Sequence, residues 1–344
     1  MHKPLMMYVK NTIFLKEKSL ILIDRRRLPL EIKKVACNNF EAVAAAIEDM
    51  VVQGAGDIAI TAGYGLYLAA LEAEEIIKRD PEMARELLYK AKSRLINTRP
   101  TGYHLAALLE DMLNNIKWED YNWADQLLNM VNRAVYNKQR CAELTGRWAS
   151  TLLEDGDCIL THCFPGSALL YMLKFAVDAN KKVEVVSTET RPYLQGARLT
   201  SWSVSELGIP VTLITDNMAA YCMNQGKISK IFTAADRIAL DGTVANKVGT
   251  FQLALAADYH KIPLYILGYA GPDAGCSGRE NIPIELRDPL EVLYFNGMRL
   301  TGEKVKGFYP GFDLTPPELV SGIITDRGII PSCNVKKYWD IAGS

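Results

Sequence analysis

The spacing of hydrophobic positions divides the chain into two regions. In residues 40–52 apolar side chains recur every three or four positions, which predicts an amphipathic helix with Asn38 or Asn39 as its N-cap. The same period predicts helices over 58–70, 81–92, 101–116 and 122–154. Ahead of them, residues 19–24 and 31–37 favour two strands joined by a charged turn. Residues 1–125 are therefore expected to form a domain with an N-terminal β-hairpin followed by helices.

From residue 157 onward, short apolar runs alternate with helical segments. Strands are expected at 158–161, 182–187, 211–215, 230–233 and 263–267, with a helix in each gap. This alternation predicts an α/β fold, a doubly wound, Rossmann-like parallel sheet occupying residues 126–344, with the helix 122–154 as the connection. No G-x-G-x-x-G follows the first strand, so the sheet is expected to bind a ligand other than a dinucleotide.

Composition narrows the class of protein. The chain has 344 residues, 49% hydrophobic and 23% charged, with 39 Lys and Arg against 40 Asp and Glu. This balance gives no indication of a nucleic-acid partner. The seven cysteines have no paired C-x-x-C spacing, which argues against a disulfide framework or a zinc ribbon and favours a cytoplasmic location. The sequence shows neither a signal peptide nor an apolar window of ~20 residues, so no membrane partner is expected.

The first expected strand of the sheet ends in a Thr-His-Cys tip. A Pro-Gly turn and Ser167, a good helix cap, follow Cys163. The Cys163 thiol is thus expected at the carboxyl end of a strand and near a helix N-terminus, where ligands bind and a thiol is biased towards thiolate. A buried structural cysteine is the alternative. His162 is adjacent, so strand alternation would point it to the opposite face, which argues against a Cys-His nucleophile.

Other strand ends also carry polar residues. Gln195 follows the strand 182–187, Asp216 follows 211–215, and Asp236 follows 230–233. Asn246 and Lys247 precede the helix 250–260, whose free backbone amides would suit an anion. A thiol and a carboxylate beside an anion site can act as base and acid on a phosphorylated small molecule.

Two further segments in the first region have both a functional and a structural interpretation. Gly54 and Ala55 lie in a Q-G-A-G-D turn that lets the backbone approach a ligand, or that only joins two helices. Arg99 precedes an expected helix and could fork onto a phosphate, although a solvated arginine is more common.

Several longer strings resemble one family. They are I-L-T-H-C at 159–163, E-T-R-P-Y-L-Q-G-A-R-L-T at 189–200, G-I-P-V-T-L-I-T-D-N-M-A-A at 208–220, A-D-R-I-A at 235–239, A-N-K-V-G-T-F-Q-L-A at 245–254, F-D-L-T-P-P-E-L-V at 312–320 and I-I-T-D-R-G at 323–328. The chain resembles the methylthioribose-1-phosphate isomerase family over nearly its whole length. That family is related to regulatory subunits of the translation initiation exchange factor and to archaeal ribose 1,5-bisphosphate isomerases.

The resemblance implies an isomerase that interconverts aldose and ketose sugar phosphates, without a cofactor or a metal, usually as a homodimer. It implies that Cys163 and Asp236 are the catalytic pair. The implied substrate contacts are Gly54, Ala55, Arg99, Gln195, Asn246 and Lys247.

One departure from the family affects the expected substrate. The family usually reads R-G-A-P-A-I-G where this chain has Gln53-Gly-Ala-Gly-Asp57-Ile-Ala, so an arginine expected near the phosphate is missing and a carboxylate is added. Losing a charge-assisted contact typically costs ~1.5 to 3 kcal/mol. The expected substrates are 5-methylthioribose 1-phosphate or 5-deoxyribose 1-phosphate, as part of nucleoside salvage. The alternatives are a ribose 1,5-bisphosphate isomerase and a non-catalytic regulatory subunit of the same fold.

Overall fold

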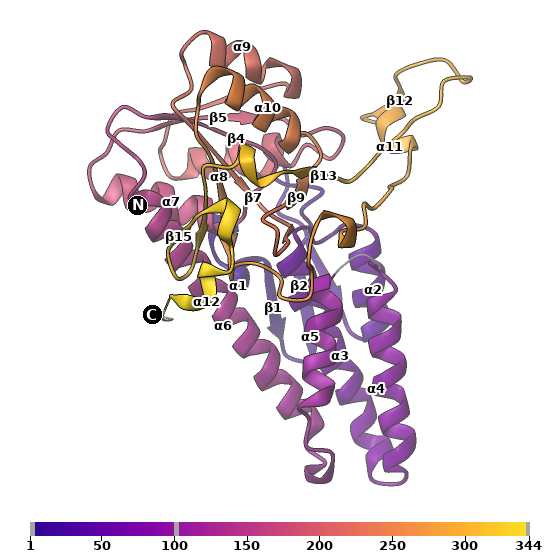
Figure 1. Cartoon of the computed structure of the whole chain (residues 1–344). Coiled ribbons are helices and arrows are strands. Elements are labelled where there is room, and N and C mark those ends of the chain that lie inside the picture. The colour runs from indigo at the N-terminus through magenta and orange to yellow at the C-terminus, as the bar shows by residue number, and fades with distance from the viewer. Residues whose placement is uncertain (1–3, 100–102, 342–344) are drawn as a thin grey trace. The chain divides into compact units, whose positions relative to one another are not determined.

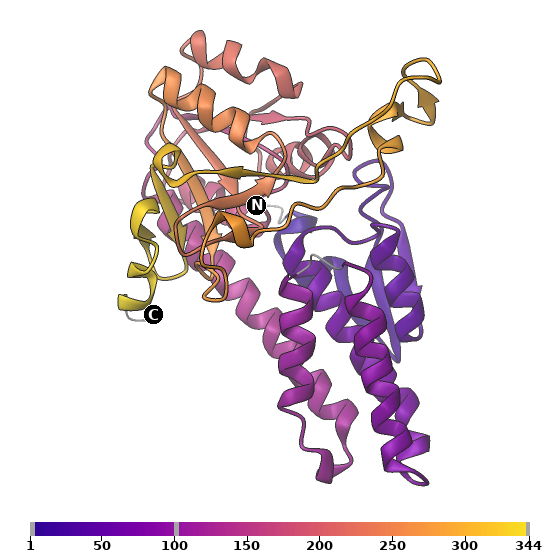
Figure 2. The ribbon, with the colours of Figure 1, turned by 45° about the vertical axis from the view of Figure 1, so that its right-hand side comes forward.

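A computed structural model describes residues 4–99 and 103–341 of the chain (Figures 1 and 2). The described residues divide into two compact units: Tyr8–Gln139, here the helical unit, and residues 4–7 with 140–341, here the α/β unit. The chain passes from one to the other inside the helix α6 (Trp123–Ser150). The domain boundary after residue 125 stays a prediction.

The helical unit begins with a small antiparallel sheet. Its strands β1 (Ile13–Lys16), β2 (Ser19–Ile23) and β3 (Lys34–Cys37) pair in that order. The expected hairpin is the β2–β3 pair, and β1 is an additional strand. The other elements of the unit are α1 (Val9–Thr12), α2 (Phe40–Glu48), α3 (Ala55–Ile77), α4 (Pro81–Ile96), α5 (Tyr103–Asn114) and η2 (Trp118–Asp120). Positions 101 and 102, where the helix before Ile116 was expected to begin, lie outside the described residues.

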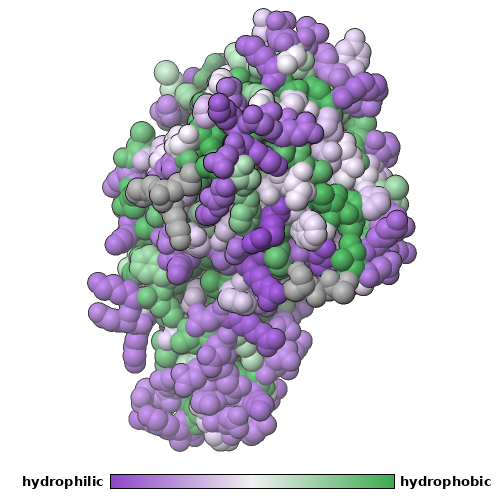
Figure 3. All heavy atoms as spheres, turned by 90° about the vertical axis from the view of Figure 1, so that its left-hand side faces the viewer, coloured by the Kyte–Doolittle hydropathy of each residue, from purple (hydrophilic) through white to green (hydrophobic). Residues whose placement is uncertain are grey.

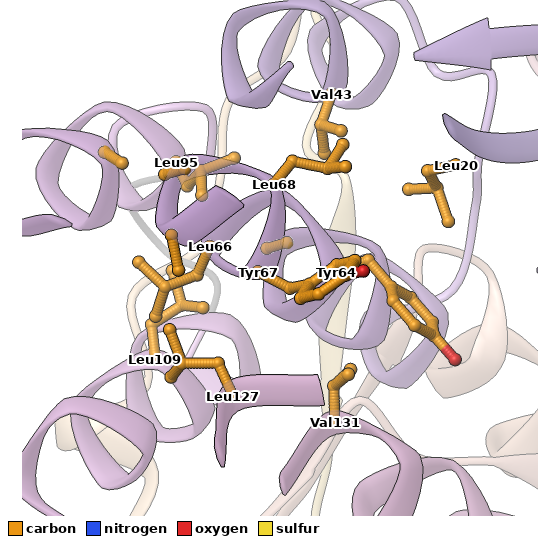
Figure 4. Packing of buried hydrophobic residues seen from close by; sticks show 14 of the residues in the cluster. Leu20, Val43, Tyr64, Leu66, Tyr67, Leu68, Leu95, Leu109, Leu127 and Val131 are labelled. Atoms are coloured by element: carbon orange, nitrogen blue, oxygen red, sulfur yellow. The ribbon is translucent and has the colours of Figure 1, made fainter. Parts of the chain in front are cut away.

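The core of the helical unit is built around α3. This helix is covered on several sides (Figure 4). Side chains that point in different directions are therefore all buried, namely those of Tyr64, Leu66, Tyr67 and Leu68. Gly65 allows one close approach: a Cβ there would lie 3.0 Å from Val43 of α2 and 3.1 Å from Leu95 of α4. The helix is therefore apolar around most of its circumference, which is typical of a central helix.

The α/β unit contains a seven-stranded sheet with the order β15-β14-β10-β7-β4-β5-β6. All neighbours are parallel except β14 and β15. Its strands are β4 (Cys158–Thr161), β5 (Glu184–Thr188), β6 (Val211–Ile214), β7 (Lys230–Ala234), β10 (Leu264–Tyr269), β14 (Gly322–Thr325) and β15 (Ile329–Ile330). The prediction of a doubly wound parallel sheet is confirmed, while β14 and β15 were not expected.

The strand order reverses between β4 and β7. From β4 the chain adds β5 and β6 on one side, then returns to add β7, β10 and β14 on the other. Right-handed crossovers in opposite directions place their helices on opposite faces of the sheet. Accordingly α7 (Ser167–Asp178) and α8 (Ser201–Glu206) cover one face, and α9 (Ala219–Asn224) and α10 (Thr250–His260) cover the other (Figure 1). The gap between β4 and β7 is thus the topological switch point, where ligands bind in such sheets.

A second, smaller sheet accompanies the large one. Its antiparallel strands are β8 (Arg237–Ile238), β9 (Val244–Lys247) and β13 (Phe312–Thr315). Between β10 and β13 the chain forms α11 (Leu290–Leu293) and the short hairpin β11 (Tyr294–Phe295) to β12 (Met298–Arg299), which projects from the rest of the unit (Figure 2). The remaining short elements are η1 (Leu5–Met7), η3 (Gly196–Thr200), η4 (Asp216–Met218), η5 (Arg279–Asn281), η6 (Pro317–Leu319), η7 (Ser332–Asn334) and α12 (Lys337–Asp340).

Hydrophilic side chains cover much of the face shown in Figure 3, with smaller hydrophobic areas between them. Within the described ranges, no helix is both long and apolar enough to cross a membrane.

Candidate active site

The topology brings the two residues expected to react to neighbouring strand ends. Thr161, the last residue of β4, pairs with Phe232 of β7. Cys163 lies two residues beyond the end of β4, and Asp236 lies two residues beyond the end of β7. Both therefore emerge from the carboxyl edge of the sheet at its switch point.

The backbone of Cys163 is held in an unusual conformation. Its φ of 61° lies in the left-handed region, which is uncommon for a residue other than glycine and is concentrated at functional sites. Two threonines hold it: the Cys163 amide donates to Thr190 Oγ1 (2.9 Å), and Thr200 Oγ1 donates to the Cys163 carbonyl (2.6 Å). The thiol is thus presented from a fixed turn.

The expected bias of this thiol towards thiolate is wrong for the protein without substrate. Burial raises the pKa of the Cys163 thiol to about 11, although the cations Lys247 and Arg287 lower it and Asp236 raises it further. Loss of hydration outweighs the nearby positive charge. The same charges show that Asp236, Lys247 and Arg287 lie close enough to act on the sulfur.

His162 is a structural residue, as expected. The imidazole is buried, with Nδ1 2.6 Å from Thr188 Oγ1 and Nε2 2.9 Å from the Val248 carbonyl. Because a carbonyl only accepts, Nε2 carries the proton and Nδ1 accepts from the threonine. Burial lowers the pKa of His162, which keeps the ring neutral. The ring therefore links the β4 tip to the β5 tip and to the segment before α10.

Asp216 has a structural role that its position at a strand tip did not reveal. Its two carboxylate oxygens accept the backbone amides of Thr190 and Arg191, each at 2.8 Å. These bonds hold the turn whose Thr190 hydroxyl positions Cys163. Asp216, which the sequence placed at a strand end beside the other polar residues, therefore supports the turn that holds Cys163 through backbone hydrogen bonds.

Gln195 lies on the same loop, immediately before η3. Its side chain is buried, and its Oε1 has no hydrogen-bond partner within the described part of the chain. A buried amide oxygen without a partner is costly, and a ligand hydroxyl would satisfy it. This observation agrees with the expected role of Gln195 as a substrate contact, which stays a prediction.

Asn246 and Lys247 lie on β9 rather than at the start of a helix. Asn246 Nδ2 donates to Thr250 Oγ1 (2.9 Å), and Lys247 Nζ donates to the Gly311 carbonyl (2.9 Å). Lys247 is buried over the ring of Phe312, 5.0 Å from its centroid. Burial lowers the pKa of its ammonium.

The expected anion site at the start of α10 is filled by the protein itself. Asp313 Oδ2 accepts the amides of Gly249 (2.7 Å) and Phe251 (3.1 Å). Because β13 pairs with β9, it delivers this carboxylate to the helix N-terminus. Burial raises the pKa of Asp313 to about 6, although both amides oppose the shift.

The three remaining predicted contacts belong to the helical unit. Gly54, with φ of 93°, is the N-cap of α3, and Ala55 is its first residue, where backbone amides have no intrahelical partner. Arg99 Nη2 donates to the Ile47 carbonyl at the end of α2 (3.0 Å) and contacts the Met50 sulfur. The roles of all three in binding substrate stay predictions.

The carboxylate that replaces a neutral residue of the family motif is neutralised locally. Asp57 forms ion pairs with Arg25 Nη2 (2.6 Å) and with Lys138. Burial alone would raise its pKa, but the charges of Lys138 and Arg25 lower the pKa of Asp57 to about 2. Arg25 also donates to the Gln53 carbonyl. The region around Gly54 therefore has more positive than negative charge, despite the missing arginine.

Sequence reasoning missed two residues near Lys247, namely Arg287 and Tyr309. No strand tip or glycine turn marks them, and only the pairing of their two segments brings them to Lys247. In the part of the chain that the structure describes, no group of three or more His, Cys, Asp or Glu side chains could hold a metal ion.

The fold and the site define a Rossmann-like α/β protein with a thiol and a carboxylate at its switch point. Residues 51–332 match the family model described as the Initiation factor 2 subunit family, and the chain belongs to this family. The predicted family and fold class are confirmed.

Relatives that are named as isomerases align with nearly the whole chain. The methylthioribose-1-phosphate isomerase of Thermosipho africanus is 39% identical over 323 residues, 90% of this chain and 92% of that protein. That of Fervidobacterium nodosum is 40% identical over 341 residues, 94% of this chain and 95% of that protein. The predicted enzyme class, an isomerase, is confirmed by these relatives.

Two solved structures are also similar. The 5-methylthioribose 1-phosphate isomerase of Pyrococcus horikoshii superposes with a TM-score of 0.83 at 34% identity, covering 96% of both chains. The translation initiation factor eIF-2B subunit delta of A. fulgidus gives a TM-score of 0.79 at 33% identity, covering 96% of this chain and 99% of the other.

Proposed function

We propose that this protein converts a 5-modified ribose 1-phosphate, with 5-methylthio or 5-deoxy at that position, to the corresponding ribulose 1-phosphate. The observation that carries the proposal is the placement of Cys163 and Asp236 on neighbouring strand ends at the switch point. The names of the relatives that are about 40% identical support the same reaction.

Asp236 is proposed as the acid that opens the sugar ring. In a furanose 1-phosphate the anomeric oxygen is blocked, so the ring does not open spontaneously to a free aldehyde. Protonation of the ring oxygen O4 lets the C1–O4 bond break with its electron pair going to O4. The same carboxylate can then take the proton from the C2 hydroxyl as the ketone forms.

Cys163 is proposed to assist hydrogen transfer from C2 to C1. It does so either as base and acid through an enol, or as a neutral thiol beside a hydride shift. The two routes differ in a measurable way, since the enol route introduces solvent deuterium at C1 and the hydride shift does not. The raised pKa of the Cys163 thiol favours the neutral form before substrate binds.

The proposed phosphate and sugar contacts are Gly54, Ala55, Arg99, Gln195, Asn246 and Lys247. The buried amide of Gln195 and the buried ammonium of Lys247 support this assignment, because each lacks full compensation in the protein alone. An apolar 5-substituent needs no second phosphate site, which disfavours ribose 1,5-bisphosphate. The proposal also includes a homodimer and a cytoplasmic location.

A non-catalytic regulatory subunit is the second candidate, because the A. fulgidus structure of the same fold is described as an initiation factor subunit. Such a subunit needs the fold and does not need the reactivity of Cys163 or Asp236.

The test compares turnover of 5-methylthioribose 1-phosphate, 5-deoxyribose 1-phosphate and ribose 1,5-bisphosphate by the purified protein. Cys163→Ala and Asp236→Asn are expected to abolish conversion while leaving the folded protein intact. Cys333→Ala and Asp258→Asn, at exposed positions, are the matched controls and should retain it. Conversion that survives either active-site substitution would contradict the mechanism, and preference for the bisphosphate would contradict the substrate class.

A further inference from the structure

Lys247 and a second buried cation, Arg287, share the same aromatic pair. Lys247 Nζ lies 5.0 Å from the ring centroid of Phe312 and 5.8 Å from that of Tyr309. The Arg287 guanidinium lies 5.5 Å and 5.9 Å from the same two centroids. Two cations therefore converge on one spot in the α/β unit, and both act on the Cys163 thiol.

Backbone pairing fixes this arrangement. Leu286 and Pro310 form an antiparallel bridge, the Arg287 amide donates to the Tyr309 carbonyl (2.9 Å), and the Gly311 amide donates to the Glu285 carbonyl (2.8 Å). The Gly311 carbonyl in turn accepts Lys247 Nζ. Arg287 belongs to this paired segment, and Lys247 of β9 is hydrogen-bonded to it. The distance between the two cations is therefore fixed partly by the backbone.

The hydroxyl of Tyr309 is buried at this spot and makes no hydrogen bond of ordinary geometry among the residues described, although Arg287 lies close enough to act on it as a donor. Tyr309 is 3% exposed, and burial raises the pKa of its phenol well above the usual range, which keeps the hydroxyl a donor. A buried hydroxyl that makes no hydrogen bond lowers stability, so such a group commonly has a functional reason.

Several carboxylates surround the pair: Glu291 interacts with both cations, and Asp313 interacts with Lys247. They do not fully compensate the burial of the Lys247 ammonium. Glu285 binds Arg287, with Nε to Oε1 and Nη2 to Oε2 both at 3.3 Å. Lys247 still has its pKa lowered, because burial and Arg287 outweigh Cys163, Asp236 and Glu285. An added anion would offset both the burial of the ammonium and the repulsion between the cations.

We propose that Arg287 and Tyr309 are further substrate contacts, which together with Lys247 donate hydrogen bonds to the phosphate of the sugar 1-phosphate. All three side chains are donors, and a phosphate oxygen is an acceptor that suits a lysine, an arginine fork and a phenol. A phosphate bound here lies beside C1, the carbon on which Cys163 is proposed to act. This inference rests on the proposed function and adds two residues to it.

The decisive variant is Tyr309→Phe, which removes only the buried hydroxyl. We expect KM to rise about tenfold or more with kcat little changed, because a hydrogen bond to a charged ligand is lost. The melting temperature should fall little, since this hydroxyl makes no hydrogen bond of ordinary geometry within the described part of the protein. The matched control is Tyr338→Phe: its buried hydroxyl donates to Asp326 Oδ1 (3.1 Å), so its melting temperature should fall while KM stays unchanged.

Binding of inorganic phosphate, measured by calorimetry, tests the contact without turnover. Tyr309→Phe should weaken it in parallel with KM. The double variant Glu285→Gln with Arg287→Gln, which removes the cation without leaving its carboxylate unpaired, should weaken it further.

Unchanged phosphate affinity in Tyr309→Phe would overturn the inference, as would a fall in melting temperature with KM unchanged. If the protein bound phosphate as expected but converted none of the three sugars, the proposed function would fail while the anion site stood.

Discussion

Replacing Asp57 by Asn tests whether the buried charge cluster at the start of α3 stabilises the helical unit. In the folded protein the pKa of Asp57 is about 2, against an ordinary value of 3.8. A difference of nearly two pKa units corresponds to about 2.5 kcal/mol, since one unit is about 1.4 kcal/mol. Its side chain is only 12% exposed, so solvent screening reduces this little.

The sign follows from the direction of the shift. A carboxyl whose folded pKa is lowered contributes stability above its unfolded pKa, and this contribution is lost as the pH falls through about 4 towards about 2. At neutral pH, Asp57→Asn should therefore lower the free energy of unfolding by at least about 2 kcal/mol, because Arg25 and Lys138 also lose their counterion. Near pH 3 the difference between variant and unsubstituted protein should shrink.

The assay is urea unfolding monitored by circular dichroism at several pH values between about 3 and 7. The matched control is Glu75→Gln in the same helix, whose pair with Lys78 is exposed, so it should change stability by less than about 0.5 kcal/mol. A loss below about 1 kcal/mol for Asp57→Asn at neutral pH, or a loss that does not depend on pH, would refute the reasoning.

Three other changes have definite expected outcomes. Burial raises the pKa of Asp313 to about 6, so its contribution to stability is present below about pH 4 and is lost as the pH rises through 6. Asp313→Asn should remove this pH dependence of the free energy of unfolding, measured with urea. An unchanged pH profile would contradict the argument. Gly146→Ala should lower the melting temperature, because a Cβ there would lie 2.4 Å from that of Tyr171, and an unchanged value would show that α6 and α7 can separate. With a thiol pKa of about 11, Cys163 should react with iodoacetamide at pH 8 about a hundredfold more slowly than an ordinary thiol, as followed by peptide mass spectrometry; equal rates would contradict the burial argument.

Local pattern was sufficient to predict the five strands β4, β5, β6, β7 and β10, at whose ends the candidate site lies, but not β14 and β15 of the same sheet. The strand over 158–161 was predicted with its observed bounds, because a short apolar run is ended there by polar residues and a Pro-Gly turn. Asn39 caps α2 through Oδ1, as one of the two expected caps. The helix expected over 58–70 extends from Ala55 to Ile77, since Gly54 alone makes the turn and helix-forming residues continue past position 70.

What the sequence did not predict depends on contacts between distant segments. The two-residue strand β8 and the pairing of β9 with β13 leave no periodic signal, so Asp313 could not be placed at the start of α10. Arg287 and Tyr309 meet only because their segments pair. The ionisation of Cys163 was predicted in the wrong direction because burial, which decides it, cannot be read from neighbouring residues.

The reversal of strand order has a consequence for how the protein is made. During synthesis Cys163 emerges with β4, and β5 and β6 can pair with it in sequence, but Asp236 joins only when β7 returns to the opposite side of β4. Lys247 and then the segment around Tyr309 follow later still. The placement of that segment depends on pairing between residues more than sixty positions apart, such as Lys247 and Phe312. A nascent or truncated chain that ends before β7 therefore holds Cys163 without Asp236, so the proposed reaction centre is among the last parts of the molecule to become complete.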